Sequence, residues 1–568
     1  MNPLPLTQLV KAVRRNPSVI RLIGVAGLTL SLSSVVYAAP DYDLMVPMND
    51  GVALHTLVYL PSDSGQYPAV LLRNPYAGSS LEMVAPKFTK NGYATVIQYV
   101  RGMAESEGQF TPFVNEHSDG KTTVEWMTEQ PWCDGRLGLW GASYLSFCGF
   151  EVARSQDSAI KAIVNVSGWA DVSTFITRGG ALRLLDQLPW LIAHAAGQPQ
   201  IPDQAWDGIF RTTPLSQFFQ DSEEEVGAAI AVPYDYNAIT IPVLHITGWN
   251  DYICSSTLEV YRRTKTNGTL AEKSKLVIGP WTHNQAFDPD STKYGDADFG
   301  ITSRMGFDSI LTLSVAWFDE HVKDLRKDTE SIPAVQYFTQ EENRWKVCDQ
   351  WPPSNASQET WYLRSTGGDT MLHKDAPSDE SWLGFEYDPN NPVPTIGGPV
   401  SYRHPFNIGV KDQSSLEGRS DVLFFESDSL EEPLEIAGQL TVVLYASTDS
   451  LDTDFTAKLV EVRSDGYARM IEDGIIRARY RERLDSAILI VPNTVQRYEL
   501  DLGEIAYRVA AASKLRLEIS SGNFPKFDRN PNDGTEPFEA TTFRTAHQKI
   551  FMSEGYPSSL TLTVVGRE

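Results

Sequence analysis

The chain has 568 residues and a formal net charge of −25, from 48 Lys and Arg against 73 Asp and Glu. This length allows two or three domains, and a composition of 42% hydrophobic and 21% charged residues excludes a disordered or fibrous polymer. The acidic balance argues against nucleic acid or an anionic membrane surface as a partner, because both attract basic residues.

The first 38 residues have the pattern of a secretory signal peptide. An apolar run over 22–36 ends at Ala38, where small residues allow cleavage, and four cations precede it: Lys11, Arg14, Arg15 and Arg21. The run is short for a membrane span of about 20 residues and contains several Ser. We therefore expect cleavage after Ala38 and an exported protein, periplasmic or secreted, with no membrane association afterwards; an uncleaved anchor is the alternative.

The four cysteines do not form a recognisable pattern. Export permits disulfides and an even number permits two, but the spacings do not resemble a zinc site: Cys133, Cys148, Cys254 and Cys348. We expect mostly buried thiols and no bound metal, and the disulfide state stays open.

The first half of the chain predicts a parallel sheet covered by helices. Residues 41–60 alternate apolar and polar around a turn sequence at 49–51, which predicts a β-hairpin. Helical stretches over 122–129 and 146–154 then separate short apolar runs that resemble buried strands, at 69–72, 94–98, 137–140, 162–166, 243–247 and 276–278. In such sheets, ligands bind beyond the carboxyl ends of the strands.

Two further changes of pattern divide the chain. Residues 169–238 interrupt the alternation, and a helical pattern over 181–196, with Pro189 as a kink or break, predicts a helical cap. After residue 350, short alternating runs typical of an all-β sandwich occur at 421–425, 440–446, 455–462, 474–481 and 515–519. The predicted parts are the signal peptide 1–38, an α/β core in two pieces (39–168 and 239–350), the cap 169–238 and the sandwich 351–568.

A candidate nucleophile lies where an apolar strand meets a helix. The strand at 137–140 leads through Gly141 and Ala142 into Ser143, and the small residues allow a tight turn that exposes the serine. The helix N-terminus that follows favours a developing oxyanion. The pattern Gly-x-Ser-x-Gly is incomplete, because Leu145 stands at the last position, and a helix-capping serine is the alternative.

A candidate acid and then a candidate base follow Ser143 along the chain, which is the order that α/β-hydrolases use. His283 comes shortly after the predicted strand 276–278, and Asp251 comes shortly after 243–247, so both lie at the strand ends where Ser143 projects. His245 lies inside a strand and is expected to be a core residue. A loop contact for His283 and a helix cap for Asp251 are the alternatives, but the three positions together predict a Ser-His-Asp triad.

Several motifs resemble one family, the cocaine esterase and X-prolyl dipeptidyl peptidase family of α/β-hydrolases. They are Arg73-Asn74-Pro75-Tyr76, Val100-Arg101-Gly102, Gly141-Ala142-Ser143-Tyr144, Gly279-Pro280-Trp281-Thr282-His283 and Ser521-Gly522-Asn523-Phe524-Pro525. The resemblance implies an α/β-hydrolase core with a helical cap insertion, plus a C-terminal all-β jelly-roll sandwich. It also implies Ser143 as nucleophile, His283 as base, Asp251 as its orienting acid, and an oxyanion hole from the Tyr76 hydroxyl and the Tyr144 backbone N–H.

The chain departs from this family at a few positions. Ser146 stands where the family usually has glycine, and Tyr99 stands where it usually has Asp. The amino-acid ester hydrolases of the family have carboxylates just after the triad acid, whereas this chain has Ile253 and Cys254 there. An ammonium-binding cluster is therefore not evident, which disfavours free α-amino acyl substrates.

The sequence thus predicts an exported serine hydrolase that cleaves a small-molecule carboxylic ester through an acyl-enzyme, without a cofactor or metal. An acylase, an amidase or an X-prolyl-type peptidase would use the same machinery, and a vestigial hydrolase that binds saccharide is an alternative of another class. Four tryptophans beside the motifs are candidates for a substrate pocket, with core packing as the alternative: Trp140, Trp169, Trp249 and Trp281. The sequence indicates no oligomeric state.

Overall fold

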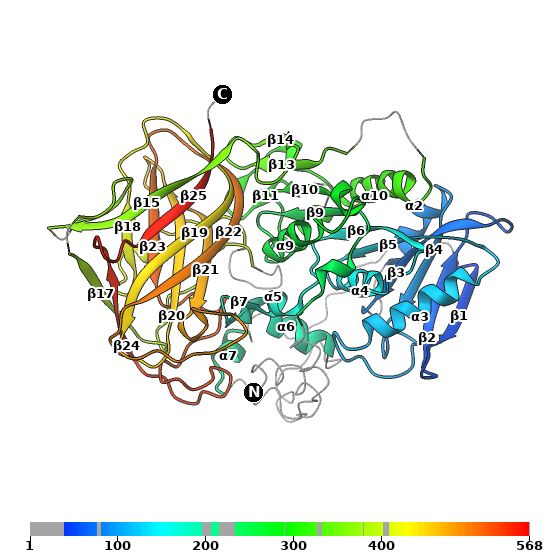
Figure 1. Cartoon of the computed structure of the whole chain (residues 1–568), viewed down its shortest axis with the longest axis horizontal. Coiled ribbons are helices and arrows are strands. Elements are labelled where there is room, and N and C mark those ends of the chain that lie inside the picture. Colours follow the sequence, from blue (N-terminus) through cyan, green and yellow to red (C-terminus); the bar gives the residue numbers. More distant parts are fainter. Residues whose placement is uncertain are drawn as a thin grey trace, which may run out of the picture.

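The structure is a computed structural model that describes residues 39–76, 81–195, 206–214, 233–288, 290–325, 332–367, 369–378, 380–400 and 408–566. The predicted signal peptide lies outside these ranges, as do parts of the predicted cap. Figure 1 shows an α/β core on one side, a β-rich part on the other, and a few short elements between them.

The core is built on a ten-stranded sheet with the order β1-β2-β4-β3-β5-β6-β9-β10-β13-β14. The strands from β4 to β13 are parallel to one another, and β1, β2 and β14 are antiparallel additions at the edges. The strands are β1 (Tyr42–Pro47), β2 (Ala53–Tyr59), β3 (Tyr67–Asn74), β4 (Ala94–Tyr99), β5 (Cys133–Ala142), β6 (Ile160–Val166), β9 (Val243–Gly248), β10 (Lys275–Gly279), β13 (Val335–Thr339) and β14 (Arg344–Cys348). All six predicted strands belong to this sheet, and the predicted hairpin joins β1 to β2.

Helices cover both faces of this sheet, which explains why its central strands are continuous apolar runs. Along β3, Val70 and Leu72 pack toward α2 and α10, whereas Ala69 and Leu71 pack toward α3 and α4. The helices are α2 (Ala85–Thr89), α3 (Glu116–Thr128), α4 (Tyr144–Ala153), α9 (Cys254–Thr264) and α10 (Phe307–His321).

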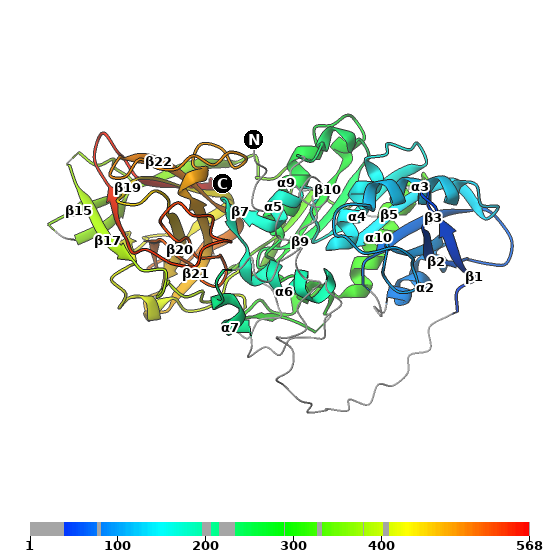
Figure 2. The same ribbon diagram turned by 90° about the horizontal axis from the view of Figure 1, so that it is seen from below.

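The cap contains a small hairpin that the sequence did not predict. The described part of the cap comprises α5 (Val172–Ile176), β7 (Thr177–Arg178), β8 (Ala181–Leu182), α6 (Leu184–Ala195) and α7 (Trp206–Arg211), and β7 and β8 form the hairpin. The predicted helix over 181–196 is wrong at its start, because Ala181 and Leu182 pair with β7 and the helix begins at Leu184. Pro189 lies inside α6 and does not end it. Figure 2 shows α5, α6 and α7 along the junction between the core and the β-rich part.

The β-rich part is a sandwich with an eleven-stranded sheet, in the order β17-β24-β19-β25-β15-β16-β18-β23-β20-β21, with β22 also paired to β19. Its apolar core includes Leu440, Val442 and Leu444 on alternate positions of β19. The strands are β15 (Ala356–Thr366), β16 (Asp369–His373), β17 (Trp382–Tyr387), β18 (Leu423–Glu426), β19 (Leu434–Thr448), β20 (Asp454–Val462), β21 (Ala468–Arg477), β22 (Gln496–Val509), β23 (Lys514–Ser520), β24 (Ala546–Phe551) and β25 (Ser559–Val565).

The sandwich forms hydrogen bonds with the backbone of the cap hairpin. The N–H of Arg477 donates to the carbonyl of Gly179 over 2.8 Å, and the N–H of Leu182 donates to the Asp528 carboxylate over 2.8 Å. The N–H of Asp528 donates back to the Leu182 carbonyl over 3.1 Å. The backbone of the cap hairpin is therefore held by a different part of the chain, through two backbone hydrogen bonds and one bond to a carboxylate.

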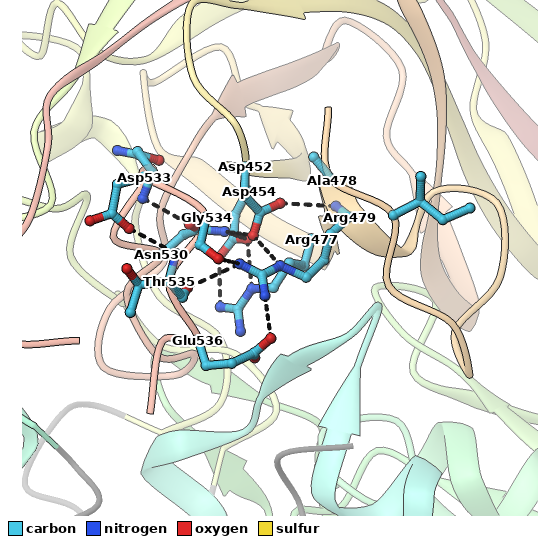
Figure 3. Close-up of polar contacts among 12 residues, drawn as sticks. Asp452, Asp454, Arg477, Ala478, Arg479, Asn530, Asp533, Gly534, Thr535 and Glu536 are labelled. Carbon is cyan, nitrogen blue, oxygen red and sulfur yellow. Dashed lines mark hydrogen bonds and ion pairs between the residues drawn. The ribbon is translucent and has the colours of Figure 1, made fainter. Parts of the chain in front are cut away.

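Buried ion pairs hold in place the sandwich residues that bind the cap hairpin (Figure 3). The Arg477 guanidinium donates to Asp454 at 2.9 and 3.0 Å. It also donates to Asp528 at 2.9 and 3.2 Å. The Asn530 side-chain amide donates to both Asp452 and Asp454. Because every charge in this group has an opposite charge or a hydrogen-bond partner, the group can stay buried.

The four cysteines are free thiols; Cys133, Cys148 and Cys254 are buried and Cys348 is half-buried. Among the residues the structure describes, none of the helices is both long and apolar enough to cross a bilayer.

Candidate active site

Ser143 lies on the tight turn between β5 and α4. Its φ is 55°, in the left-handed region that is unusual for a residue with a side chain. The turn is held because the Ser143 N–H donates to the Val166 carbonyl of β6 over 2.9 Å. A Cβ on Gly141 would overlap the backbone of Leu145, so the approach of strand and helix needs glycine there.

Ser146 also belongs to this turn. Its hydroxyl donates to the Gly141 carbonyl over 2.6 Å, and its Cβ lies against Gly168. The serine therefore fits at the position where the family usually has glycine, because Gly168 leaves space for it.

Asp251 and His283 lie on neighbouring loops at the carboxyl ends of β9 and β10. Asn250 ties the two loops together: its N–H donates to the Trp281 carbonyl over 3.0 Å and its side-chain amide donates to the Pro280 carbonyl over 2.7 Å. Because β9 and β10 are parallel neighbours, both loops lie on the same edge of the sheet as Ser143.

The three side chains form one series of hydrogen bonds. His283 Nε2 lies 3.1 Å from Ser143 Oγ, and His283 Nδ1 lies 3.0 and 3.1 Å from the two carboxylate oxygens of Asp251. Asp251 is 2% exposed and His283 is 7% exposed, and the Ile253 N–H donates a further hydrogen bond to Asp251. With its proton on Nδ1, the imidazole presents Nε2 to the serine hydroxyl as an acceptor.

The two tyrosines of the predicted oxyanion hole lie on the same side of the core. Tyr144 is the first residue of α4, so its backbone N–H has no acceptor one turn earlier in the helix. Tyr76 comes two residues after β3, and its N–H donates to the Asn74 side chain over 2.9 Å. The indole N–H of Trp190 in α6 donates to the Tyr76 hydroxyl over 3.4 Å.

Glu116 holds the Tyr144 side chain in place. The Tyr144 hydroxyl donates to Glu116 over 2.7 Å and accepts from the Phe113 N–H over 2.8 Å. Burial raises the pKa of Glu116, whereas the hydrogen bond from Tyr144 lowers it. Burial also raises the pKa of Tyr144 well above its ordinary value, so this phenol stays protonated and can donate.

An aromatic cluster surrounds Tyr144. We use this name for Tyr144 with Phe113, Trp169, Phe175 and Trp190, whose rings stack or meet edge to face. The larger hydrophobic core around it also contains Tyr252 and, from the sandwich, Phe524 and Phe538. The core, the cap and the sandwich therefore all contribute side chains around the candidate site.

The four predicted pocket tryptophans do not lie together. Only Trp169 belongs to the aromatic cluster, where it stacks on Phe175 with ring centroids 3.6 Å apart. The other three are buried elsewhere in the hydrophobic core, and their indole N–H groups donate to Ser314, Phe338 and Ser303: Trp140, Trp249 and Trp281 respectively. A role in binding substrate stays a prediction for all four.

Sequence reasoning did not identify Glu116 or Trp190. Glu116 contacts Tyr144, and Trp190 contacts both Tyr76 and Tyr144. Both residues are distant along the chain from the tyrosines they contact, and neither lies in a motif. His245, expected in the core, is fully buried beside Asn165, and burial lowers its pKa to about 3. Among the described residues, no group of three His, Cys, Asp or Glu side chains is placed to hold a metal ion.

Comparisons with known proteins cover almost the whole chain. Residues 50–285, which include Tyr76, Ser143, Asp251 and His283, match the X-Pro dipeptidyl-peptidase (S15 family). Residues 327–561 match the X-Pro dipeptidyl-peptidase C-terminal non-catalytic domain. The cocaine esterase of Rhodococcus sp. (strain MB1 Bresler) is 31% identical over 576 residues, which cover 92% of this chain and 98% of that protein.

Solved structures share the fold over a similar extent. An aminopeptidase from the marine sediment archaeon Thaumarchaeota archaeon has a TM-score of 0.77 at 23% identity, covering 96% of this chain and 99% of that one. An α-amino acid ester hydrolase has a TM-score of 0.76 at 24% identity, covering 97% and 100%. The fold is thus an α/β-hydrolase core with a cap and a β-sandwich. The chain belongs to the cocaine esterase and X-Pro dipeptidyl-peptidase family of serine hydrolases.

Proposed function

We propose that this hydrolase cleaves a carboxylic ester through an acyl-enzyme, with Ser143 as the nucleophile. The observation that carries the proposal is the unbroken series of hydrogen bonds from Asp251 through His283 to Ser143. Ser143 attacks the ester carbonyl as His283 takes its proton, and Asp251 stabilises the imidazolium that forms. His283 then gives the proton to the leaving alcohol.

The negative charge that develops on the carbonyl oxygen needs hydrogen-bond donors. In the proposal, these are the Tyr76 hydroxyl and the Tyr144 backbone N–H, and losing one such donor typically lowers the rate about 10²–10³-fold. In the second half of the reaction, His283 activates a water molecule that releases the acyl group from Ser143.

An ester is the preferred substrate class because the cocaine esterase aligns over nearly the full length of both proteins. Amide cleavage by an acylase or an X-prolyl-type peptidase is the second candidate, because residues 50–285 match the S15 family. The two reactions share the nucleophile and differ in the protonation of the leaving group, so the ratio of the two activities separates them.

We also propose that the protein is exported, because four cations and a short apolar run precede Ala38. The test is to express the full chain and to determine the N-terminus of the protein outside the cytoplasm. Export is supported if the chain there begins at Ala39, and an unprocessed chain that stays with the cell membrane contradicts it.

The activity test compares a panel of p-nitrophenyl esters with the matching anilides. The proteins are the chain from Ala39 and its Ser143→Ala variant, with labelling by a fluorophosphonate as a second measurement. We expect ester turnover and labelling in the parent protein, and a loss of several orders of magnitude in the variant. Faster turnover of anilides would favour the amide reaction. A folded parent protein that neither turns over nor labels would contradict a working serine hydrolase.

A further inference from the structure

Trp190 of the cap helix α6 contacts both residues of the proposed oxyanion hole. Its indole N–H donates to the Tyr76 hydroxyl, and its ring stacks on the ring of Tyr144 with centroids 5.3 Å apart and planes 19° apart. We infer that Trp190 is a positioning residue that aligns the oxyanion hole from the cap. This inference rests on the proposed function, since it assigns a task within that reaction.

The hydrogen bond determines what the Tyr76 hydroxyl can do. An indole nitrogen can only donate, so the phenol oxygen is the acceptor in this contact and its own proton must point to a different acceptor. In the reaction that acceptor is the developing oxyanion. A donor on the phenol oxygen also polarises its O–H bond and strengthens the bond it donates. The N–O distance of 3.4 Å is long, as catalytic hydrogen bonds often are without substrate.

The stacking contact between Trp190 and Tyr144 acts on the second proposed donor, the Tyr144 backbone N–H. The Tyr144 ring contacts the rings of Trp190 and Phe113, with centroids 5.3 and 5.4 Å away, and these two rings also contact each other at 6.1 Å. The Tyr144 hydroxyl donates to Glu116. Because the Tyr144 backbone N–H belongs to the same residue as this ring, fixing the ring limits the movement of the N–H. Trp190 thus contributes to the position of both donors, one directly and one through a ring.

Trp190 is itself held firmly by the cap. One turn earlier in α6, the Gln187 side chain donates to the Phe175 carbonyl over 3.0 Å, and Gln187 is fully buried. Phe113 and Phe175 both pack against the Trp190 ring, with centroids 6.1 Å away. A shift of α6 would therefore move the indole relative to Tyr76, which couples the position of the cap to the chemistry of the site.

The experiment is a double-mutant cycle with Trp190→Phe, Tyr76→Phe and the two together. We expect Trp190→Phe to lower kcat about tenfold with KM changed less than threefold, because the effect lies on an oxyanion donor and not on ground-state binding. Tyr76→Phe should lower kcat about 10²-fold. Adding Trp190→Phe to Tyr76→Phe should cause little further loss, since the hydroxyl that the indole aligns is already gone.

Trp345→Phe is the matched control. Its indole N–H also donates one hydrogen bond, to the Thr302 carbonyl over 2.7 Å, but Trp345 lies on β14 at the far edge of the core sheet. This variant should keep the parent kcat. If Trp190→Phe fails to fold, the sulfur analogue of tryptophan, benzothienylalanine, is introduced at position 190, because it keeps the ring and lacks only the N–H.

Two results would overturn the inference. One is a Trp190→Phe or benzothienylalanine protein with unchanged kcat, and the other is a loss that multiplies fully with that of Tyr76→Phe. Failure of the proposed function looks different, because then Ser143→Ala would keep its activity or the parent protein would have none. A Trp190 variant is therefore interpreted only where Ser143→Ala is inactive.

Discussion

At the scale of single residues, the turn that carries Ser143, the proposed nucleophile, is under backbone strain. A left-handed conformation at a residue other than glycine is destabilising by about 1–3 kcal/mol, and neighbouring contacts must offset this. At Ser143 those contacts include the hydrogen bond to β6 and the bonds of the first turn of α4, in which the Ser146 and Phe147 N–H groups donate to the Ser143 carbonyl. The position of the hydroxyl therefore depends on how closely β5, β6 and α4 pack.

Gly141→Ala tests this dependence. The added methyl group would overlap the Leu145 backbone, so α4 must move away from β5, and we expect a loss of most ester turnover together with a lower thermal midpoint. Gly149→Ala is the control in the same helix, where the nearest atom would be 3.8 Å away; it should keep activity and stabilise the helix by about 0.5–1 kcal/mol. Equal activities of the two variants would refute the argument.

Asp251→Asn tests the orienting acid. The amide oxygen can still accept from the Ile253 N–H, so the fold should be kept, but the carboxylate that stabilises the imidazolium is lost. We expect kcat to fall by about 10³–10⁴-fold while KM and the thermal midpoint change little, as steady-state kinetics and thermal unfolding would measure. A loss below tenfold would mean that Asp251 does not orient His283.

At the scale of elements, the cap hairpin β7–β8 depends on the sandwich more than on its own sequence. Gly179 and Gly180 have φ of 53° and 81°, and a Cβ on Gly179 would overlap the Ile475 carbonyl oxygen. Arg183, just after the hairpin, is 4% exposed and donates to the carbonyl of Tyr252, the residue after Asp251, over 2.5 Å. The hairpin thus connects the sandwich to the loop that carries Asp251.

Gly179→Ala should break this connection. We expect a lower thermal midpoint and a reduced kcat, because displacement of the hairpin also displaces Arg183 and the loop around Tyr252. Gly208→Ala in α7 of the same cap, where a Cβ would meet nothing within 4 Å, should leave kcat unchanged and should not lower the thermal midpoint. A Gly179→Ala enzyme with the kcat of the parent protein would show that the contact between the sandwich and the hairpin does not affect the site.

The elements also show where sequence reasoning succeeds. The apolar strands of the core sheet and the turn at Ser143 are encoded locally, by runs of buried residues and by the glycines that follow them, and these predictions agree with the structure. The start of α6 could not be predicted, because Ala181 and Leu182 are apolar and helix-compatible, and it is their pairing with β7, supported by the contact of Leu182 with Asp528, that makes them a strand. Trp190 was missed for the same reason, since 114 residues separate it from Tyr76.

At the scale of the whole molecule, an ionisable carboxyl is buried where the cap meets the sandwich. Glu472 of β21 is 5% exposed, and burial raises its pKa to about 8, against an opposing effect of the nearby Arg178 of the cap. A carboxyl with an ordinary pKa of 4.5 thus stays protonated in the fold up to about pH 8. Between about pH 4.5 and pH 8 this carboxyl ionises only in the unfolded chain, so the group increasingly favours unfolding over that range.

Glu472→Gln should remove this penalty. The folded pKa is raised, so the parent protein loses stability as pH rises from about 4.5 to about 8 and then loses no more from this group. We expect the variant to be more stable than the parent at pH 9, by about 2–4 kcal/mol, and to match it near pH 4.5. Thermal midpoints across this range measure the effect, with the exposed Glu499→Gln on β22 as control; a gain independent of pH would contradict it.

The long-range assembly of the site has a consequence for when activity arises. Phe524 and Phe538 reach the hydrophobic core around Tyr144, and β19 closes the sandwich by pairing with β25, where Val442 lies opposite Leu560. A growing chain therefore lacks these contacts until nearly all of its residues have left the ribosome. An incompletely synthesised chain has Ser143, Asp251 and His283 without these contacts, so we expect hydrolysis to begin only when the sandwich has formed.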